Sequence, residues 1–426
     1  MTESVHRALA PGAGAAPVAR IVTFSTLFPN VIDPKHGVFV ETRLRHLVQQ
    51  GSVEARVIAP VPWFPSANPA FGRYARYATV PSHEERFGIA VEHPRYLTLP
   101  KVGMHVAPAL LARAALPVFR RLRHDGFDFQ AIDSHYLYPD GVAAAIIADA
   151  LGCPFVMTAR GTDVTLIPRS PPARHKILWA AERAAAIVTV CESLKRDLVA
   201  LGVRGDKITP LRNGVDLDLF QPLDPAAARS ELGLAAGTWL ASVGHLIPRK
   251  GHELVIEALT DLPDVRLLIV GEGELRNSLE ALARSKGVVD RVVFFGVASQ
   301  AKLRSVYSAV DALVLASSRE GWANVLLEAM ACGTPVVATD VDGTSEVVQA
   351  SEAGVLVRER SAAAIAARTR ELLASKPDRA ATRRYAEQFS WDDTTRGQLR
   401  IFSSITARAP AAGGTLRARS AEARTA

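Results

Sequence analysis

Cysteine is scarce in this chain, and no cysteine has the spacing of a metal ligand. The 426 residues include three cysteines, Cys153, Cys191 and Cys332, each within an apolar segment. Isolated thiols in such surroundings behave as small core residues. The cysteines therefore exclude a cysteine-based metal centre, and they fit a protein of the reducing cytoplasm.

Long apolar runs are also missing. No uninterrupted apolar stretch reaches about 18 residues, so no segment is predicted to span a membrane. Residues 1–17 carry an acid near their start and no long apolar core, which excludes a typical export signal. With 48% hydrophobic and 22% charged residues, the composition indicates a soluble globular protein, and the length allows two or three domains.

Acidic residues are in the minority, and the formal net charge is +7. Arginine is scattered along the chain without an aromatic-rich basic motif, so nucleic acid is not an expected partner. One stretch, residues 101–123, has five Lys or Arg, no acid, and apolar residues at helical intervals. Two interpretations are open: a packing helix with a solvated basic end, or a helix that lies on anionic lipid.

Apolar strand-like runs alternate with helical segments through most of the chain. The first set of predicted strands is 19–25, 53–60, 89–92, 130–135, 154–159 and 187–191, and the second is 239–244, 266–271, 292–296, 312–316, 335–339 and 355–357. Such alternation predicts an α/β fold with parallel sheets, and the break near 205–220 predicts two of them. Residues 61–100 are less regular, which is typical of a functional or mobile excursion. Residues 361–405 are predicted to be helical.

The most informative stretch is residues 311–340, DALVLASSREGWANVLLEAMACGTPVVATD. It predicts a strand, a loop over residues 317–324, a helix from Val325 that Gly333 and Pro335 end, and a second strand. Ligands of open parallel sheets bind at the carboxyl ends of strands, and a helix amino terminus offers free N–H groups to an anion. The loop is therefore a candidate phosphate and sugar site, framed by Glu320 and Glu328 at a Glu-x7-Glu spacing.

This string resembles the Glu-x7-Glu motif of retaining glycosyltransferases of family 4, which have the GT-B fold. The resemblance covers residues 19–405 and implies two facing Rossmann-like domains with parallel sheets and a C-terminal crossing helix. The implied division is a low-complexity leader at 1–17, an acceptor domain at 18–205, a nucleotide-sugar donor domain at 206–385, a helix returning to the first domain at 386–406, and a disordered tail at 407–426. Glu320 would then hold hydroxyls of the transferred sugar and Glu328 the ribose.

Two further segments of the second half match the family in part. In residues 242–251, SVGHLIPRKG, Lys250 stands where the family has a lysine that holds the donor diphosphate, but His245 replaces the arginine of the pair. Arg249 or a protonated His245 would have to supply the second cation. Gly271 and Gly273 resemble a Gly-x-Gly element near the nucleotide, and their glycines are expected to be turn residues first.

In the first half, three positions resemble family sites. His135 stands where the family has a histidine that faces the donor sugar, and Arg160 takes the histidine position of a Thr-x-His-Gly-x-Asp pattern. A donor or positive role is therefore plausible for Arg160, and proton transfer is not. Gly37 resembles a glycine whose backbone approaches the diphosphate.

The resemblance implies an anomer-retaining enzyme that moves a sugar from a UDP- or GDP-sugar to a saccharide or lipid-linked acceptor. It implies neither a metal nor a further cofactor. The catalytic candidates are Glu320, His135 and Lys250, and further donor contacts are expected at Gly321, Asn324, Val325 and Leu326. Surface polysaccharide or glycoconjugate synthesis at the inner face of the membrane fits this interpretation. A non-catalytic sugar-nucleotide-binding partner and a sugar-nucleotide epimerase of the same fold remain alternatives.

Overall fold

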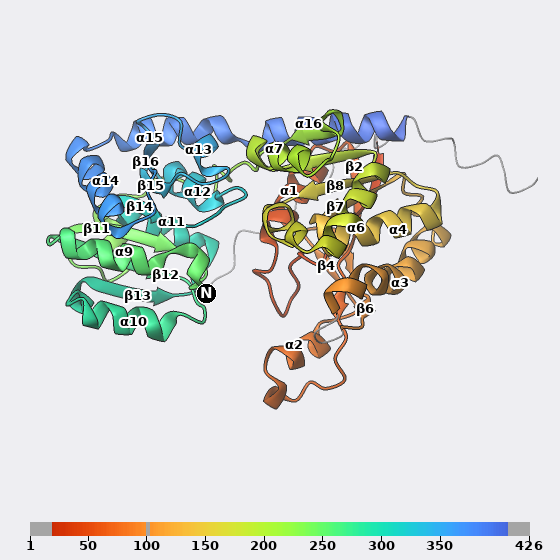
Figure 1. Ribbon diagram of the computed structural model, residues 1–426, viewed down its shortest axis with the longest axis horizontal. Coiled ribbons are helices and arrows are strands. Elements are labelled where there is room, and N and C mark those ends of the chain that lie inside the picture. The colour runs from red at the N-terminus through yellow and green to blue at the C-terminus, as the bar shows by residue number, and fades with distance from the viewer. Residues whose placement is uncertain (1–18, 99–102, 408–426) are drawn as a thin grey trace, which may run out of the picture. The chain divides into compact units, whose positions relative to one another are not determined.

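The computed structural model describes residues 19–98 and 103–407, which form two compact α/β units (Figure 1). Of these residues, unit 1 contains those up to Thr189, Leu198–Thr209 and those from Thr395 on. Unit 2 contains Val190–Asp197 and Pro210–Thr394. The predicted leader, and the predicted tail apart from residue 407, lie outside the described residues.

Unit 1 is built on an eight-stranded sheet of order β10-β9-β8-β7-β1-β2-β5-β4. The strands are β1 Ala19–Phe24, β2 Val53–Ile58, β4 His83–Arg86, β5 Ile89–Glu92, β7 Ala131–His135, β8 Phe155–Ala159, β9 Ala186–Thr189 and β10 Ile208–Pro210. The central pairs are parallel, and β4 joins β5 antiparallel at the edge. Its helices are α1 Val38–Gln49, α2 Arg73–Thr79, α3 Gly103–His124, α4 Val142–Leu151, α5 Thr162–Thr165 and α6 Pro171–Arg183, while α7 Glu192–Ala200 belongs to both units.

Unit 2 has a six-stranded sheet of order β13-β12-β11-β14-β15-β16, in which every pair is parallel. The strands are β11 Thr238–Val243, β12 Val265–Val270, β13 Val292–Gly296, β14 Ala312–Leu315, β15 Val336–Thr339 and β16 Gly354–Val357. The helices are α8 Pro225–Glu231, α9 His252–Ala258, α10 Arg276–Ser285, α11 Gln300–Ala309, α12 Asn324–Ala331, α13 Thr344–Val347, α14 Ala362–Ser375 and α15 Arg379–Ala386. The last helix, α16 Trp391–Thr406, begins in unit 2 and continues in unit 1.

The sheet of unit 2 is buried on both faces, which is why its strands are continuous apolar runs. Leu240 and Leu267 pack with α9, α10 and α14 in one hydrophobic core. The next residues along the same strands, Ala241 and Leu268, are also buried, at 0% exposure each. Because successive side chains of a strand point to opposite faces, both faces of this sheet are covered.

The irregular stretch predicted at residues 61–100 contains more structure than the sequence indicated. Besides β4 and β5 it holds α2, a 3₁₀ turn η1 at Pro69–Phe71, and a two-stranded parallel sheet of β3 Val61–Pro62 and β6 Arg95–Tyr96. Strands of two residues are too short for an alternating pattern to be recognised. The polar sequence of β4, HEER, fits an edge strand and carries no strand-like apolar run.

The helical prediction for residues 361–405 is confirmed, with interruptions. Lys376 has a positive φ of 45°, which ends α14, and the Asp378 side chain accepts the N–H of Ala380 at 2.9 Å to cap α15. A second break precedes α16.

The basic segment at residues 101–123 forms α3 from residue 103 on, while residues 101–102 lie outside the described part. Its apolar side chains Leu111, Ala112, Ala115 and Phe119 are at most 4% exposed. The apolar face of the helix from Leu111 to Phe119 is therefore packed within unit 1, whereas Met104 and Val106 near its start are 49% and 37% exposed. Within the two described ranges, no helix is both long enough and apolar enough to cross a bilayer.

Candidate active site

The carboxylate of Glu320 lies at the centre of a charged cluster in unit 2. Its side chain follows β14 and is only 8% exposed. Lys250 Nζ donates to Glu320 Oε1 at 2.5 Å, Ser317 Oγ donates to the same oxygen at 2.7 Å, and Arg249 Nη1 lies 3.4 Å from it. Burial alone would raise the pKa of Glu320, but the charge and hydrogen bond of Lys250, with Ser317 and Arg249, hold it below its usual value. Glu320 is therefore ionised at neutral pH.

Sheet order brings Lys250 and Glu320 together although they are 70 positions apart. Lys250 ends the 3₁₀ turn η5, Pro248–Lys250, in the loop after β11, and Glu320 lies in the loop after β14. Strands β11 and β14 are parallel neighbours, so their carboxyl ends meet at one edge. The backbones of the two loops are also joined, since Ser318 N–H donates to the Arg249 carbonyl at 2.9 Å and Arg249 Nη1 donates to the Arg319 carbonyl at 3.0 Å.

The structure brings Arg249, and not His245, to this carboxylate. The His245 side chain is exposed, and its carbonyl accepts a hydrogen bond from His252 Nε2 at 3.2 Å. His252 is buried against Ser242 Oγ at 2.8 Å, and burial lowers its pKa to about 4. His252 is therefore a neutral structural histidine. Of the two residues considered for the second cation, Arg249 is the one that lies beside Glu320.

Gly271 and Gly273 allow two loops to pack backbone against backbone. A Cβ at Gly271 would lie 1.9 Å from the Gly244 carbonyl oxygen, and a Cβ at Gly273 would lie 2.4 Å from the Leu246 oxygen. The Leu246 N–H also donates to the Glu272 carbonyl at 2.9 Å. These glycines hold the loop after β12 against the loop that carries Lys250, which accounts for them without any nucleotide contact.

Glu328 lies on α12, partly buried, with one clear partner. Tyr307 OH donates to Glu328 Oε2 at 2.7 Å. Burial raises the pKa of Glu328 to about 7, and the hydrogen bond from Tyr307 opposes that rise. The carboxylate is therefore poised between its two protonation states at neutral pH.

The start of α12 offers fewer free N–H groups than the sequence indicated. The helix begins at Asn324, and the Leu326 N–H already donates to the Ala323 carbonyl at 3.0 Å. The Leu326 side chain is fully buried, whereas Val325 is half-buried. Of the predicted backbone donors, the Leu326 N–H is thus already bound within the protein, and Gly321 lies in the preceding loop.

Asp342 is a residue of this site that the sequence reasoning missed. Its Oδ2 accepts the Glu320 N–H at 2.8 Å, and it has a positive φ of 45°. Such a backbone conformation is uncommon outside glycine and is enriched for Asp and Asn. The only sequence signal is the Asp-Gly dipeptide at positions 342 and 343, which follows β15 after two intervening residues.

In unit 1, His135 is enclosed by charged neighbours. Its side chain is 1% exposed, with Nε2 3.1 Å from Asp133 Oδ2 and Nδ1 2.7 Å from Arg160 Nη2. Because a guanidinium can only donate, Nδ1 accepts and Nε2 carries the hydrogen that Asp133 accepts. Burial lowers the pKa of His135 and outweighs the opposing charge of Asp133, so the ring is neutral. Both ring nitrogens thus face protein groups in this structure.

Arg160 is the least buried member of this cluster, since His135 and Asp133 are at most 2% exposed. Its guanidinium lies 4.9 Å from the centre of the Phe39 ring, and burial, together with the nearby charge of Arg43, lowers its pKa to about 9. It remains charged at neutral pH. The cluster therefore presents a cation at the carboxyl ends of β7 and β8, with His135 beneath it.

Gly37 and Asp140 shape the loop that follows β1. Gly37 begins α1 with a φ of 70°, and a Cβ there would lie 2.3 Å from the Leu27 carbonyl oxygen. Asp140 Oδ2 accepts the Thr26 N–H at 2.9 Å, and burial raises the pKa of Asp140 to about 7. The Gly37 position is therefore closed to any larger residue by its own loop.

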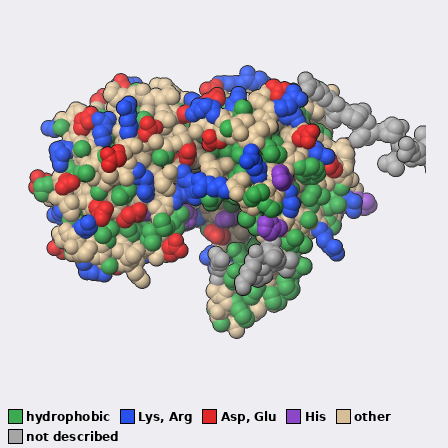
Figure 2. Space-filling model, viewed as in Figure 1, with side chains coloured by type: hydrophobic (Ala, Val, Ile, Leu, Met, Phe, Trp, Pro, Cys, Tyr) green, Lys and Arg blue, Asp and Glu red, His purple; other side chains and the backbone are tan. Residues whose placement is uncertain are grey.

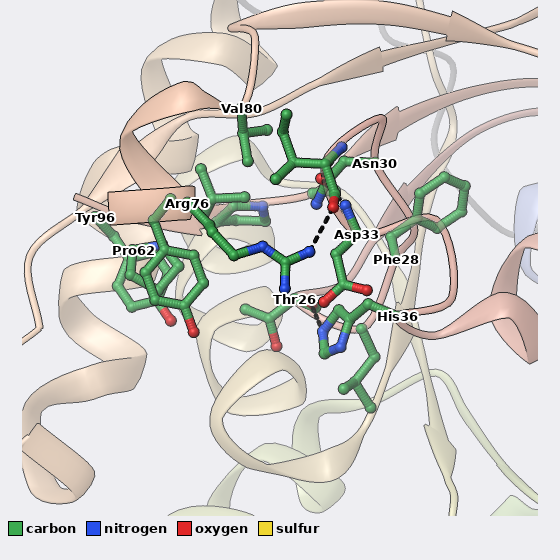
Figure 3. A pocket seen from close by; sticks show the side chains of 15 residues that line it. Thr26, Phe28, Asn30, Asp33, His36, Pro62, Arg76, Val80 and Tyr96 are labelled. Atoms are coloured by element: carbon green, nitrogen blue, oxygen red, sulfur yellow. Dashed lines mark hydrogen bonds between the residues drawn. The ribbon is translucent and has the colours of Figure 1, made fainter. Parts of the chain in front are cut away.

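A pocket of about 370 Å³ opens beside this loop in unit 1 (Figure 3). Its walls come from the loops after β1 and β2, from α2 and from β6, and they include Asn30, Asp33, His36, Arg76 and Tyr96. His36 Nε2 lies 3.0 Å from the Thr26 carbonyl oxygen, and Arg76 Nη2 donates to the Ile32 carbonyl at 2.6 Å, as the dashed lines in Figure 3 show. Aromatic rings next to amide, carboxylate and guanidinium groups suit a ligand rich in hydroxyl groups.

No candidate metal centre accompanies these clusters. Across residues 19–98 and 103–407, no group of three or more His, Cys, Asp or Glu side chains is arranged to hold a metal ion.

Two family models match the chain. The model described as Glycosyl transferases group 1 matches residues 232–389, and the model described as Glycosyltransferase Family 4 matches residues 37–219. TuaC of Bacillus subtilis strain 168, described as a teichuronic acid biosynthesis glycosyltransferase, is 29% identical over 353 residues, which are 82% of this chain and 87% of TuaC. The D-inositol 3-phosphate glycosyltransferase of Segniliparus rotundus is 33% identical over 318 residues, which are 69% of each protein.

Solved structures with the same arrangement are more distant in sequence. Sucrose-phosphate synthase from Thermosynechococcus elongatus has a TM-score of 0.74 at 20% identity, covering 91% of this chain and 99% of its own. HepE of Anabaena, solved in complex with UDP-glucose, has a TM-score of 0.69 at 20% identity, covering 91% of this chain and all of its own. At these identities the structural likeness speaks for the fold.

We expect Gly271→Ala to destabilise unit 2 by about 2–4 kcal/mol, because the added carbon would overlap the Gly244 carbonyl. Gly287→Ala is the matched control, since Gly287 also has a positive φ, 67°, but a Cβ there would meet no atom within 4 Å. The free energy of unfolding of this control should fall by only about 1–2 kcal/mol, because alanine tolerates a positive φ less well than glycine does. Urea unfolding of both variants measures the difference, and equal losses would contradict the close-packing role.

Glu328→Gln should stabilise the protein at alkaline pH. Because burial raises the pKa of Glu328 from 4.5 to about 7, its contribution to stability is complete below pH 4.5 and is lost as the pH rises through about 7. We expect the free energy of unfolding of Glu328→Gln to exceed that of wild type by about 1–2 kcal/mol at pH 8 and by less at pH 5. Urea unfolding at both pH values tests this, with the surface change Glu257→Gln as control. A gain that does not depend on pH would contradict the prediction.

Proposed function

The chain belongs to the group 1 glycosyltransferases of family 4 and has their GT-B fold, and we propose that it transfers a sugar from a UDP- or GDP-sugar to a saccharide or lipid-linked acceptor with retention of the anomeric configuration. The observation that carries the proposal is the buried contact of Lys250 and Arg249 with Glu320 at the carboxyl ends of β11 and β14. A UDP-linked donor is supported by HepE, which was solved with UDP-glucose. The names of TuaC and of the D-inositol 3-phosphate glycosyltransferases support a saccharide or polyol acceptor in surface polysaccharide or glycoconjugate synthesis.

In the proposed reaction, Lys250 and Arg249 neutralise the leaving diphosphate. Two unit charges 4 Å apart interact by about 4 kcal/mol at an effective dielectric constant near 20. The amino terminus of a helix such as α12 contributes about 0.3–2 kcal/mol. The two side chains therefore outweigh the helix terminus, and they need no metal ion to assist the departure of the nucleoside diphosphate.

Glu320 accepts hydrogen bonds from hydroxyls of the sugar that is transferred. Its low pKa keeps it an acceptor at neutral pH, and Asp342 and Ser317 fix the backbone and the side chain that carry it. When the diphosphate enters, Lys250 shares its charge between the phosphate and Glu320. The carboxylate then has hydrogen-bonding capacity for the sugar.

The transfer itself is proposed to take place on one face of the sugar. The bond from the anomeric carbon to the leaving phosphate oxygen breaks, and a bond to the acceptor oxygen forms on the same face. The acceptor proton goes to the leaving phosphate, so no protein base is required. This route retains the anomeric configuration. It also requires no protein nucleophile, and none of the carboxylates in the sequence motifs is assigned that role.

Glu328 is proposed to hold the ribose of the donor. A ribose diol donates hydrogen bonds to an ionised carboxylate, so donor binding favours loss of the proton that burial holds on Glu328. Tyr307 supplies a permanent donor to the other side of the same group.

In unit 1, the proposed role of His135 differs from the one that the sequence suggested. With both ring nitrogens occupied by Asp133 and Arg160, His135 positions the Arg160 guanidinium. Arg160 is then the group that contacts the substrates, and the pocket of about 370 Å³ is the proposed place of the acceptor saccharide.

We expect release of nucleoside diphosphate from one sugar nucleotide in a panel of UDP-, GDP- and ADP-sugars, with membrane lipid extract as acceptor. Lys250→Ala and Glu320→Ala should each lower this rate about 100-fold to 1,000-fold, because each removes a preorganised charge at the reacting centre. Lys302→Ala removes a surface cation that pairs with Glu231, and it should leave the rate unchanged. Full activity in Lys250→Ala would contradict the proposed site.

The same assay tests the proposed chemistry. We expect the rate to be unchanged by EDTA, and we expect NMR of the product to show the anomeric configuration of the donor. An inverted product would exclude same-face transfer, and a rate that EDTA abolishes and Mg²⁺ restores would contradict charge neutralisation by Lys250 and Arg249 alone.

A further inference from the structure

We propose that an aromatic lobe of unit 1 binds the surface of an anionic lipid bilayer. The lobe comprises residues 61–82, with β3, η1 and α2, and the adjacent Leu97. In Figure 1 it is drawn in orange and extends away from the main sheet of unit 1. Figure 2 shows hydrophobic side chains gathered over this part of the molecule.

Large apolar side chains of the lobe are exposed instead of packed in the core. Trp63 is 47% exposed, Phe71 51%, Tyr74 44% and Leu97 54%. Single exposed apolar residues are ordinary, but a group of aromatic rings on one short segment marks an interaction surface.

The exposed rings form one continuous cluster. The Phe64 ring lies 5.3 Å from the Phe71 ring and 5.6 Å from the Tyr74 ring, and Tyr74 lies 6.2 Å from Tyr77. The Trp63 N–H donates to the Tyr96 carbonyl at 2.7 Å, which places Trp63 beside the strand that leads to Leu97. The rings of Phe64, Phe71, Tyr74 and Tyr77 therefore form one cluster, and Trp63 precedes Phe64 in the chain.

The lobe is held firmly enough to present this cluster. Arg95 donates to the carbonyls of Tyr77 and Val80 at the end of α2, and Arg76 donates to the Ile32 carbonyl at 2.6 Å. Cations at the carboxyl end of a helix stabilise it. Helix α2 is thus fixed to the rest of unit 1, and the Tyr74 ring that it carries remains exposed to solvent.

Charge identifies the occupant as an anionic surface. The continuous stretch 61–124 contains nine Lys or Arg and three acidic residues, Glu84, Glu85 and Glu92, all of them in the β4–β5 hairpin. The stretch therefore has a clear excess of positive charge, although Glu92 pairs with Arg121. Helix α3 lies within this stretch and packs against β6 beside the lobe. Trp and Tyr rings favour the headgroup region of a bilayer, and nearby Lys and Arg add attraction to anionic lipids. A bilayer that carries anionic headgroups matches both features.

The lobe also forms part of the pocket wall, because Arg76 and Tyr77 line it. A lobe seated on a bilayer would bring the pocket to the depth at which a lipid-linked saccharide leaves the headgroup layer. This role of the pocket rests on the proposed function, whereas binding of the lobe to a bilayer does not. The binding assay therefore contains no sugar nucleotide.

The test is co-sedimentation of the full chain with vesicles of phosphatidylcholine alone, or with about a third phosphatidylglycerol. We expect binding to the anionic vesicles that weakens with salt. The triple variant Trp63→Ser, Phe71→Ser, Tyr74→Ser should reduce the partition coefficient about tenfold or more, since three rings lose their apolar contact with lipid. Phe87→Ser is the matched control, because Phe87 is a 57% exposed ring outside the lobe, and it should bind like wild type.

Tryptophan fluorescence gives a second readout. Trp239, Trp322 and Trp391 are at most 8% exposed, and Trp179 lies on α6 outside the lobe, so Trp63 is the tryptophan whose emission should shift to the blue on vesicle binding. Trp63→Phe should keep the binding and lose most of the shift. Equal binding of wild type and the triple variant would overturn the proposal. The proposal would also be overturned if the triple variant changed the self-association of the chain, or its binding to another protein, while wild type did not bind vesicles.

Discussion

The buried ion pair between Lys250 and Glu320 is the interaction on which the candidate site of unit 2 depends. A carboxylate that is 8% exposed would be strongly disfavoured without its cations, and Lys250 at 2.5 Å offsets the loss of water. The pair also fixes the chemistry, because it keeps Glu320 an acceptor and stores a cation at the place where a diphosphate is proposed to leave. The same contact therefore stabilises unit 2 and carries the proposed chemistry.

Backbone packing at the edge of the sheet positions that pair. The parallel order of β12, β11 and β14 sets three loops side by side, and glycines let their backbones approach more closely than any other residue allows. Two of these loops are further tied by the Arg249 hydrogen bonds. Rigid loops of this kind keep charges in place before a ligand arrives, which is the condition for electrostatic stabilisation without reorganisation.

Sequence reasoning succeeded where a long pattern carried the information. The strands of unit 2 are apolar runs that end in loops, so its parallel sheet could be predicted from the sequence alone. The structure also brings Glu320 and Lys250, which were named from two of those loops, into contact, while their roles toward a substrate stay predictions. Contacts between residues distant in the chain could not be predicted. Arg160 and Asp133 occupy both ring nitrogens of His135, which no sequence pattern indicated, and the role of His135 toward a sugar stays a prediction. The position of Arg249 beside Glu320, the contact of Asp342 with Glu320, and the folding of residues 61–82 into an exposed aromatic lobe likewise follow from three-dimensional packing.

The most direct test of the account is calorimetric titration of Glu320→Gln with a nucleoside diphosphate and with the matching nucleotide sugar. If Lys250 and Arg249 hold the diphosphate while Glu320 holds the sugar, this variant binds the nucleoside diphosphate at least as tightly as wild type, because Lys250 is released from its partner. It should lose the additional affinity that the sugar provides. Equal weakening toward both ligands would contradict this division of roles.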